Sequence, residues 1–588
     1  MDTQGSARKP ERATIVAGGG KQGRSVGVPL ATTVKHQALS GIGSRPVRLL
    51  LVLPRFPEGF WTFDWVFKHV ITGRAAVNPP LGLATLAALT PSDWQVTLVD
   101  ENIESIDFDA DVDLVAVGGM SVQSGRQIEI LNAFRQRGRY VVAGGSYATL
   151  CPERYGPHAD TLVLGEAEQV WPTFCQDFAA QRPLSVYVET GDVPLAGSPC
   201  PRHELIKWDR YLAGAIQYSR GCPFLCEFCD IIVMFSRKPR QKDLQQIEAE
   251  LDAMRLRGVH NVVFVDDNLF GHPAACRALL AFLVEYQQRH RYPFVFGGEI
   301  TINVASHPDV LTLLRLANFA WLFIGIETPN AQSLAETRKT QNLKGDMLTA
   351  IRAIYAHGID VFGGFIVGFD ADDLSIFDIQ RDFIVDAGIV LAMVGMLMAP
   401  PRTPLYQRLA KEGRLVSDDV QSALINAGMS TNIIPLQMTR AELQHGTAAL
   451  HRELLDDRNI HRRLANKLRY LESPPNYHFP PREWGSIFFG LLRHGIARGG
   501  PRRCGYFLAS LALALAKPRQ FSRRLRTIVA NWSYALALRD YVDRTLAESH
   551  EEAGVTTAAS LSSRPGSPTS PVPGPAPGRL ADSETMAP

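Results

Sequence analysis

The stretch Gly221-Cys-Pro-Phe-Leu-Cys-Glu-Phe-Cys-Asp230 places three cysteines, Cys222, Cys226 and Cys229, within one short loop. Their spacing is C-x3-C-x2-C, with an aromatic residue directly before the third thiol. Fe–S clusters are held by cysteine thiolates and usually take four of them. A loop that supplies only three thiolates leaves one iron without a protein ligand, so this iron can bind a small molecule. The spacing therefore predicts a catalytic Fe–S cluster rather than an electron wire.

Two other uses of these cysteines fit the sequence less well. A zinc site would want a fourth Cys or His at matching spacing, such as a second C-x2-C. None follows, and the next cysteine is Cys276. A disulfide is disfavoured because nothing at the N-terminus reads as a secretory signal. Eight cysteines without such a signal predict a reducing, cytoplasmic setting, which also suits an oxygen-sensitive cluster.

The composition is that of a globular protein, with 46% hydrophobic and 20% charged residues. A chain of 588 residues is too long for one core, so about two to four domains are expected. The net charge of +2 gives no global field that would attract nucleic acid, so no nucleic-acid partner is predicted. The longest apolar candidate, Tyr506 to Ala516, is too short for a membrane-spanning helix.

The two ends of the chain differ from its middle. Residues 1–45 are rich in Gly, Ser, Lys and Arg without clear periodicity, and residues 548–588 are rich in Pro and Ser. Such compositions cannot bury enough apolar surface to order the chain, so both segments are predicted to be disordered tails. Three structured regions are predicted between them, at residues 46–185, 205–425 and 426–547.

In residues 46–185, apolar runs alternate with helical segments. The run Val47 to Leu53 is continuously apolar, as expected for a strand of a parallel sheet that is buried on both faces. The alternation predicts a Rossmann-like, doubly wound α/β domain, and such sheets bind ligands at the carboxyl ends of their strands. Glycines at three of these ends would let a flat, bulky ligand approach the backbone. The candidate binding residues are Gly118, Gly119, Met120, Gly144, Gly145, Ser146, Gly165 and Glu166.

Residues 205–425 repeat the alternation, with about six strands. In β/α barrels the chemistry gathers at the carboxyl ends of the strands. Asp266 and Asp267 follow one strand and could be helix N-caps or ligand contacts. Glu299 and Glu327 each follow a buried strand and a glycine, where a carboxylate is hard to explain as solvated surface. The candidate binding residues here are Gly298, Glu299, Glu327, Gly364 and Gly368.

Residues 426–547 read as helical, and two short apolar stretches, Trp484 to Leu492 and Tyr506 to Ala516, lie among many arginines. Basic flanks around a short apolar helix fit an element that lies on an anionic lipid surface. The alternative is an ordinary helix that packs on the barrel and has a solvated basic face. The basic residues are Arg498, Arg502, Arg503, Lys517, Arg519, Arg523, Arg524 and Arg526.

The cysteine motif, with Phe228 before its last thiol, resembles the signature of the radical S-adenosylmethionine (SAM) superfamily. The resemblance implies a partial (β/α)6 barrel and a [4Fe–4S] cluster whose fourth iron chelates SAM. It assigns the SAM amino group to Gly297-Gly298-Glu299 and the ribose to Gly325-Ile-Glu327. It places the adenine near Gly364 to Gly368. No catalytic side chain beyond the cofactor ligands is predicted.

A Rossmann-like domain directly before such a core resembles the cobalamin-binding domain of cobalamin-dependent radical SAM enzymes. The strings Val141-Val-Ala-Gly-Gly-Ser-Tyr-Ala-Thr149 and Gly165-Glu-Ala-Glu168 carry this resemblance. The D-x-H-x-x-G motif, whose His replaces the lower base of cobalamin in many such domains, is absent from the sequence. Cobalamin is therefore expected to bind without a histidine ligand, unless the domain has lost the cofactor.

Over residues 46–470 the chain is most similar to cobalamin-dependent radical SAM enzymes of the hopanoid C-2 methylase type. Further strings that carry this resemblance are Pro79-Pro-Leu-Gly82, Phe264-Val-Asp-Asp-Asn268 and Ala399-Pro-Pro-Arg-Thr-Pro-Leu405. It implies that a SAM-derived radical takes hydrogen from an unactivated carbon, which then takes methyl from methylcobalamin. It also implies a small-molecule or lipid substrate and a flavodoxin or ferredoxin as electron donor. The enzyme is expected in the cytoplasm, with a peripheral contact to the inner face of the membrane.

Three alternatives remain at this stage. A radical SAM cyclase or rearrangement enzyme of the anaerobic magnesium-porphyrin cyclase type has the same two-domain plan. A methylthiotransferase would need further cluster cysteines in the first domain, and only Cys151 and Cys175 lie there. A non-enzymatic cobalamin or Fe–S sensor is the third alternative, and SAM cleavage by the reduced protein would count against it.

Overall fold

The computed structural model describes residues 31–562 apart from residues 41, 44, 190, 417–429 and 476. The predicted tails at 1–45 and 548–588 lie largely outside this range, although the last helix, α20 (Phe521–Ser562), continues past the predicted boundary. The chain divides into two units, Met1–Val542 and Asp543–Pro588. The description below concerns the first unit.

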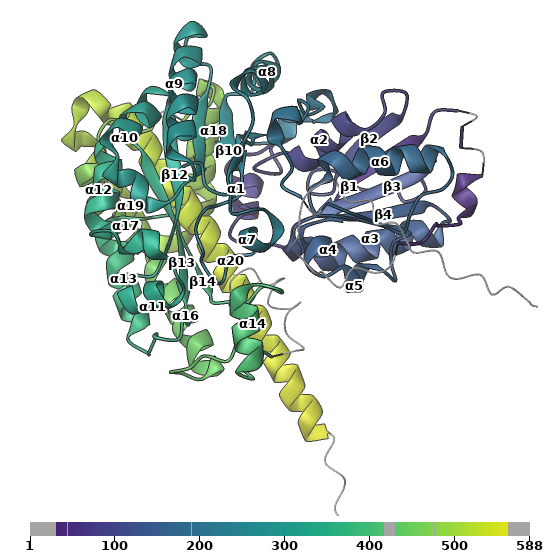
Figure 1. The fold of residues 1–588 in the computed structure, drawn as a ribbon. Coiled ribbons are helices and arrows are strands. Elements are labelled where there is room, and N and C mark those ends of the chain that lie inside the picture. The colour runs from purple at the N-terminus through teal and green to yellow at the C-terminus, as the bar shows by residue number, and fades with distance from the viewer. Residues whose placement is uncertain are drawn as a thin grey trace, which may run out of the picture. The chain divides into compact units, whose positions relative to one another are not determined.

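The first domain is a parallel six-stranded sheet of order β2-β1-β3-β4-β5-β6. Its helices cover both faces, with α2 (Leu81–Leu89) and α6 (Ala167–Ala179) on one and α3 (Ser124–Gln136), α4 (Ser146–Leu150) and α5 (Pro152–Tyr155) on the other (Figure 1). Each face has its own apolar core. The predicted doubly wound fold is confirmed, with β6 as an additional edge strand. The strands are β1 (Arg48–Leu53), β2 (Gln95–Asp100), β3 (Leu114–Gly119), β4 (Tyr140–Gly145), β5 (Thr161–Leu164) and β6 (Val186–Val188).

The second domain is a six-stranded parallel sheet in which β10 to β14 follow one another in chain order, with β7 beside β10. This open, sequential order is the predicted partial (β/α)6 barrel, which is confirmed. The strands are β7 (Gly214–Ile216), β10 (Asn261–Phe264), β11 (Val295–Glu299), β12 (Phe319–Glu327), β13 (Asp360–Val367) and β14 (Ala392–Met396). The helices between them are α8 (Leu244–Arg255), α9 (Pro273–Arg289), α10 (Pro308–Leu316), α11 (Ala331–Glu336), α12 (Met347–Ala356) and α13 (Ile376–Ala387).

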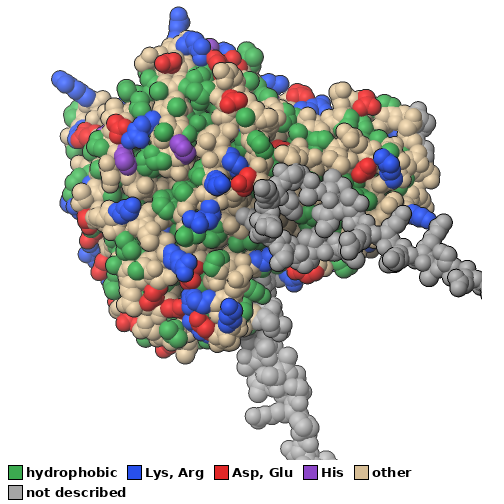
Figure 2. Space-filling model, in the orientation of Figure 1, with side chains coloured by type: hydrophobic (Ala, Val, Ile, Leu, Met, Phe, Trp, Pro, Cys, Tyr) green, Lys and Arg blue, Asp and Glu red, His purple; other side chains and the backbone are tan. Residues whose placement is uncertain are grey.

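The two faces of the barrel sheet have different partners. Side chains alternate along a strand, and in β13 Phe365 meets Phe383 of α13, whereas Phe362 meets Tyr534 of α20. Helices such as α13 therefore cover the outer face, and α20 packs on the inner face. Figure 2 shows both signs of charge interspersed on the outer surface, as the small net charge predicts.

The helical C-terminal region is anchored at the amino ends of the barrel strands. The ammonium of Lys467 lies 2.6 Å from the carboxylate of Asp360, which begins β13, and both side chains are fully buried. Arg463 donates to the carbonyls of Ile389 and Val390 just before β14. The region comprises α16 (Arg440–Leu454), α17 (Asp457–Tyr470), α18 (Pro481–Gly490), α19 (Gly500–Ala512) and α20. Helix α14 (Pro404–Lys411) precedes it and contacts the cysteine loop, where Arg408 lies 2.8 Å from Glu227.

A segment of the first domain also belongs to the barrel. Between β1 and α2 the chain forms α1 (Asp64–His69), and Val66 and Val70 pack in the barrel core. Just before it, the ring of Trp61 lies 5.0 Å from that of Phe323 in β12, measured between centroids. Among the helices that the structure describes, none combines the length and apolar run needed to cross a bilayer.

Candidate cofactor site

The cysteine loop lies at the carboxyl edge of the barrel sheet. It follows β7 and starts from β8 (Ser219–Arg220), which pairs antiparallel with β9 (Arg240–Gln241) beyond α7 (Ile231–Met234). Gly221 has φ of 96°, and a Cβ there would lie 2.5 Å from the Ser236 carbonyl oxygen. A side chain at this position is sterically excluded, so glycine is required for the turn into the cysteines.

The carboxylates after β10 hold this loop in place. Buried Asp266 accepts from the backbone N–H of Tyr218 and from the backbone and hydroxyl of Ser219, the hydroxyl at 2.6 Å. Asp267 accepts from the backbone N–H of Gly221 at 2.7 Å. Burial raises the pKa of Asp266 to about 7 and that of Asp267 to about 6. These residues are neither helix N-caps nor free ligand contacts in this structure, because they fix the loop.

Donors and a cation surround the thiols. Asn268 Nδ2 lies 3.9 Å from the sulfur of Cys222, and Gln341 Nε2 lies 3.6 Å from the sulfur of Cys226. The ammonium of Lys339 lies 5.9 Å from the centre of the Phe228 ring, within the same loop. Hydrogen bonds and positive charge near the sulfurs stabilise thiolate ligands and tune a cluster. The spacing of the cysteines did not reveal Asn268, Gln341 or Lys339.

The chemistry of this donor set fits an Fe–S cluster. Burial raises the pKa of Cys222 and Cys229, so their thiolates need a metal to compensate for the lost hydration. Within the described ranges no three His, Cys, Asp or Glu side chains already stand in a metal-binding arrangement. Cys222, Cys226 and Cys229, which share one short loop, are the residues that would hold the cluster.

Glu299 is the last residue of β11, at the carboxyl end of the strand. Its side chain is exposed, yet protein surrounds it, and burial, with Asp267 and Asp266 nearby, raises its pKa to about 7. It stands in register with Phe323 on β12, whose ring contacts Trp61. The Trp61 side chain is 55% exposed. A carboxylate and two aromatic rings thus share the inner face of the barrel near the carboxyl end of its strands.

The other predicted residues of the barrel have partners within the chain. Glu327 has a positive φ of 65° and its carboxylate lies 2.6 Å from the ammonium of Lys339. Gly368 has φ of 98°, and a Cβ there would lie 2.9 Å from Leu443. A Cβ on Gly298 would lie 3.1 Å from that of Phe264, and one on Gly364 would lie 3.0 Å from the Phe323 ring. Of the predicted carboxylates, Glu299 is exposed and Glu327 is paired with Lys339.

At the Rossmann sheet, the predicted glycines come together on one edge. Gly118 and Gly119 at the end of β3 stand in register with Gly144 and Gly145 at the end of β4. A Cβ on Gly145 would lie 2.3 Å from the Gly119 carbonyl oxygen. The neighbouring Met120 side chain is 59% exposed. This arrangement leaves a side-chain-free backbone edge that a flat ligand could approach.

The hydroxyls and the last strand end complete this edge. Ser146 Oγ lies 3.5 Å from Ser121 Oγ, across the two strand ends. Gly165 has φ of 85° and its backbone N–H donates to the hydroxyl of Thr149 at 3.0 Å. Helix α7, which follows the cysteines, packs against α4, which follows Gly145. The carboxyl edges of the two sheets therefore meet around the cysteine loop.

Glu166 links the two domains. Its buried carboxylate accepts from Arg220 at 2.7 Å and from Arg240 at 2.8 Å, the two residues that pair between β8 and β9. Glu168 lies 2.8 Å from the same Arg220 guanidinium. Arg220 is two residues before Cys222, so the Rossmann domain grips the start of the cysteine loop. The sequence predicted Glu166 as a cofactor contact, and in this structure its carboxylate is occupied by arginines.

The match to known proteins agrees with this geometry. Residues 216–378 match the family model described as the radical SAM superfamily, and residues 403–545 match a domain of unknown function, DUF4070. The chain belongs to the radical SAM superfamily. It is therefore an enzyme that cleaves SAM reductively at a [4Fe–4S] cluster.

Individual relatives show which members of the radical SAM superfamily the chain is similar to. The chain is 38% identical over 390 residues to the hopanoid C-2 methylase of Rhodopseudomonas palustris (strain TIE-1), covering 65% of this chain and 73% of the relative. It is 35% identical over 394 residues to the uncharacterized methyltransferase sll1242 of Synechocystis sp., covering 66% and 73%. The structure of the cobalamin-dependent S-adenosylmethionine radical enzyme OxsB matches with a TM-score of 0.54 at 15% identity, covering 87% of this chain and 81% of that one.

We predict that Glu166→Gln destabilises the protein by about 2–3 kcal/mol, because it leaves a buried arginine short of a charged partner. Glu153→Gln is the matched control, since Glu153 pairs with Arg402 at 3.6 Å across the same two domains but is largely exposed. The control should change stability by less than about 1 kcal/mol. Urea unfolding of both variants checks this, and equal effects would contradict the role given to Glu166.

We predict a pH-dependent effect of Glu299→Gln. The raised pKa means that Glu299 favours folding most below its ordinary value of 4.5 and that this contribution is lost as pH rises through about 7. Replacing it by Gln should therefore raise the melting temperature of the cofactor-free protein more at pH 8 than at pH 5. Exposed Glu285→Gln is the control. The same shift at both pH values would show that Glu299 is fully solvated.

Proposed function

We propose that this enzyme methylates an unactivated carbon of an apolar lipid of the hopanoid class, using methylcobalamin. The observation that carries the proposal is the meeting of the two carboxyl edges, where α4 packs against α7. A corrin on the glycine edge of the Rossmann sheet would then lie beside the element that holds the cluster. Such proximity is what transfer between two cofactors and one substrate requires.

The residues present fit a corrin. The paired glycines at 118–119 and 144–145 leave the backbone edge open, and Gly145 cannot carry a side chain without meeting Gly119. The sequence lacks D-x-H-x-x-G, so the lower face is proposed to have no imidazole ligand. Cys222, Cys226 and Cys229 are the proposed cluster ligands. Gly298, Glu299, Glu327, Gly364 and Gly368 are the proposed SAM contacts, with the amino group at Glu299.

The cluster, SAM and cobalamin supply the electron, the radical and the methyl group when they are bound. The chain's own residues position them. Asp266 and Asp267 fix the backbone that carries the cysteines, and Glu166 ties that backbone to the Rossmann domain. Trp61 and Phe323 present apolar rings beside Glu299, where they can pack on a ring system and exclude water.

The cyclase alternative is the weaker one. The anaerobic magnesium-protoporphyrin IX monomethyl ester cyclase of Synechocystis shares 25% identity over 217 residues, against 38% over 390 residues for the methylase. The two reactions differ in whether a methyl group is gained. A methylase transfers the labelled methyl of SAM to its product, and a cyclase does not.

The experiment is anaerobic reconstitution with iron, sulfide, cobalamin and a low-potential reductant, followed by incubation with methyl-deuterated SAM and a hopanoid. We expect a product that carries the labelled methyl, with 5′-deoxyadenosine and S-adenosylhomocysteine formed in equal amounts. Cys226→Ala should abolish SAM cleavage, and Cys200→Ala, at an exposed cysteine outside the loop, should not. SAM cleavage without label in any product would refute methyl transfer to this substrate class.

The proposed partners are a flavodoxin or ferredoxin, as electron donor, and a lipid surface. The apolar stretch predicted at Tyr506 to Ala516 forms the end of α19 and the turn after it, η10 (Leu513–Ala516). Leu508 is 63% exposed and Leu515 is 65% exposed, and between them Ala509 and Ala512 are exposed as well. This spacing places one apolar stripe on one face of the helix.

Two of the flanking arginines have structural roles. Arg524 is buried and donates to the carbonyls of Leu468 and Leu513. Arg503 lies 3.1 Å from the carboxylate of Asp457. Charge reversal at these two positions would disturb packing, so they cannot test lipid contact cleanly. The exposed apolar residues of the stripe are better targets.

We predict that Leu508→Glu with Leu515→Glu weakens partition onto anionic vesicles by at least about tenfold, because two apolar side chains leave the interface and two negative charges enter it. The control is Leu256→Glu with Leu374→Glu, two exposed leucines on the barrel. Sedimentation with phosphatidylglycerol-containing vesicles measures the partition. No partition of the native protein at low salt would contradict lipid contact by this stripe.

A further inference from the structure

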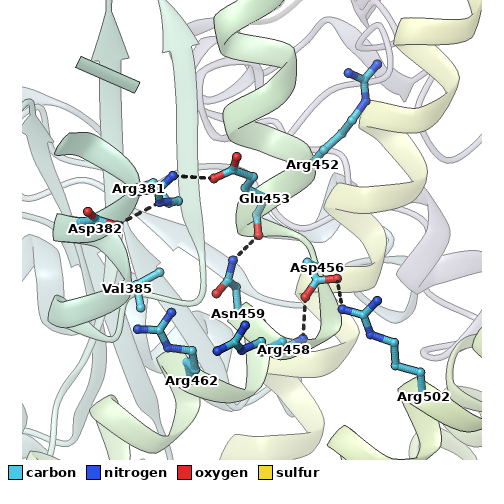
Figure 3. A pocket seen from close by; sticks show the side chains of 10 residues that line it. All are labelled: Arg381, Asp382, Val385, Arg452, Glu453, Asp456, Arg458, Asn459, Arg462 and Arg502. Carbon is cyan, nitrogen blue, oxygen red and sulfur yellow. Dashed lines mark hydrogen bonds and ion pairs between the residues drawn. The ribbon is translucent and has the colours of Figure 1, made fainter. Parts of the chain in front are cut away.

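A hollow of about 460 Å³ lies among α13, α16, α17 and α19, outside the cofactor site. Figure 3 shows its lining, which is mostly charged. Five arginines face three carboxylates, an excess of two positive charges. The lining residues are Arg381, Asp382, Val385, Arg452, Glu453, Asp456, Arg458, Asn459, Arg462 and Arg502.

The carboxylates of the hollow are already paired. Arg381 lies 2.8 Å from Glu453 and 2.9 Å from Asp382. Arg502 lies 3.0 Å from Asp456, which also caps the first turn of α17. These pairs engage Arg381 and Arg502. Among the residues that the structure describes, the other three guanidinium groups of the hollow form no ion pair with a carboxylate.

Two of these arginines, Arg458 and Arg462, are placed to bind an anion together. They stand one turn apart on α17, both are exposed, and within the described part of the chain neither has a carboxylate partner. Like charges at this spacing repel one another. Bidentate contacts with a phosphate would remove the repulsion. Arg452 points away from the other side chains drawn in Figure 3.

The hollow is remote from the cofactors. Its elements, the end of α16 and the start of α17, lie where Arg463 donates to the carbonyls before β14. That is the amino edge of the barrel sheet, whereas the cysteine loop lies at the carboxyl edge. An electron donor must approach the cluster, so this hollow is poorly placed for a flavodoxin. A ligand bound in the hollow could therefore fix the position of the enzyme on a surface without contacting the reacting groups.

The apolar stripe begins beside the hollow. Arg502 lines the hollow from the first turn of α19, and the exposed residues Gly505, Leu508, Ala509 and Ala512 follow it at helical spacing. A surface that combines an apolar stripe with an anion-binding hollow at one end matches a phospholipid, which has acyl chains beneath a phosphate.

We infer that the arginine hollow binds the phosphate of an anionic membrane lipid while the α19 stripe enters the interface. The inference rests on the lipid contact in the proposed function and adds a headgroup site to it. The stripe and seven of the ten residues that line the hollow, Arg458 and Arg462 included, fall within residues 403–545, the region matched by the domain of unknown function. This region thus acquires a role as a membrane-docking module appended to the radical SAM barrel.

The test compares Arg458→Gln with Arg462→Gln against Arg469→Gln with Arg482→Gln. The control pair removes the same charge from exposed positions on α17 and α18 outside the hollow. Vesicles of phosphatidylcholine with and without phosphatidylglycerol are the probe. The hollow variant should lose about tenfold in binding to the anionic vesicles and the control less than about threefold. Equal losses would overturn the inference, because general surface charge would then explain the binding.

Three further readouts separate the sources of any effect. Glycerol 3-phosphate in solution should compete only weakly, and full competition at low concentration would mean a soluble phosphate ligand instead. Loss of flavodoxin-driven reduction with normal vesicle binding would mean that the hollow docks the electron donor. Dithionite-driven SAM cleavage in detergent should be unchanged in the hollow variant. That readout keeps a failure of this inference distinct from a failure of methyl transfer.

Discussion

The whole site depends on one buried carboxylate, that of Asp266, which accepts hydrogen bonds from two consecutive backbone N–H groups before the cysteine loop. Burial opposes its ionisation, so these bonds are what keep the carboxylate stable in the interior. With Asp267 on the backbone of Gly221, two adjacent residues fix where the loop leaves the barrel. Asn268, next in sequence, then reaches the sulfur of Cys222. One strand end thus positions the metal-binding loop through three side chains.

The Rossmann domain is joined to the same loop by charge. Glu166 and Glu168 meet Arg220, and Arg240 joins from the paired strand. Buried ion pairs are costly to form and strongly destabilising to break, so they specify one arrangement of their partners. These ion pairs therefore fix the carboxyl edge of the Rossmann sheet relative to that of the barrel sheet. They end at Arg220, two residues before Cys222. The aromatic segment before α1 makes a second link, because Trp61 reaches Phe323 inside the barrel.

The two sides of the C-terminal region have different roles: one packs against the barrel and the other is exposed. Its inward side carries Lys467 and Arg463, whose charges are satisfied by Asp360 and by carbonyls at the amino edge of the barrel. Its outward side carries the α19 stripe and the arginine hollow. Helix α20 packs on the inner face of the barrel near Phe362, whereas Glu299 at the carboxyl end of β11 is exposed. The cysteine loop and the proposed docking surface therefore lie at opposite edges of one barrel.

The sequence by itself determined the succession of strands and helices along the chain, the doubly wound fold, the three cysteines and the glycines at the strand ends, because periodicity and spacing are local properties of the chain. The partial barrel followed from the resemblance of the cysteine motif and the strand pattern to the radical SAM family. The sequence did not reveal that Glu166 serves Arg220 and Arg240, that Asp266 holds the cysteine loop, or that α1 belongs to the barrel core. It also counted Arg524 among exposed basic residues, whereas the fold buries it. These roles depend on partners that are distant in the sequence; Glu166 and Arg240, for example, are 74 residues apart. Only the tertiary structure brings such groups within hydrogen-bonding distance and removes the water that would otherwise solvate them.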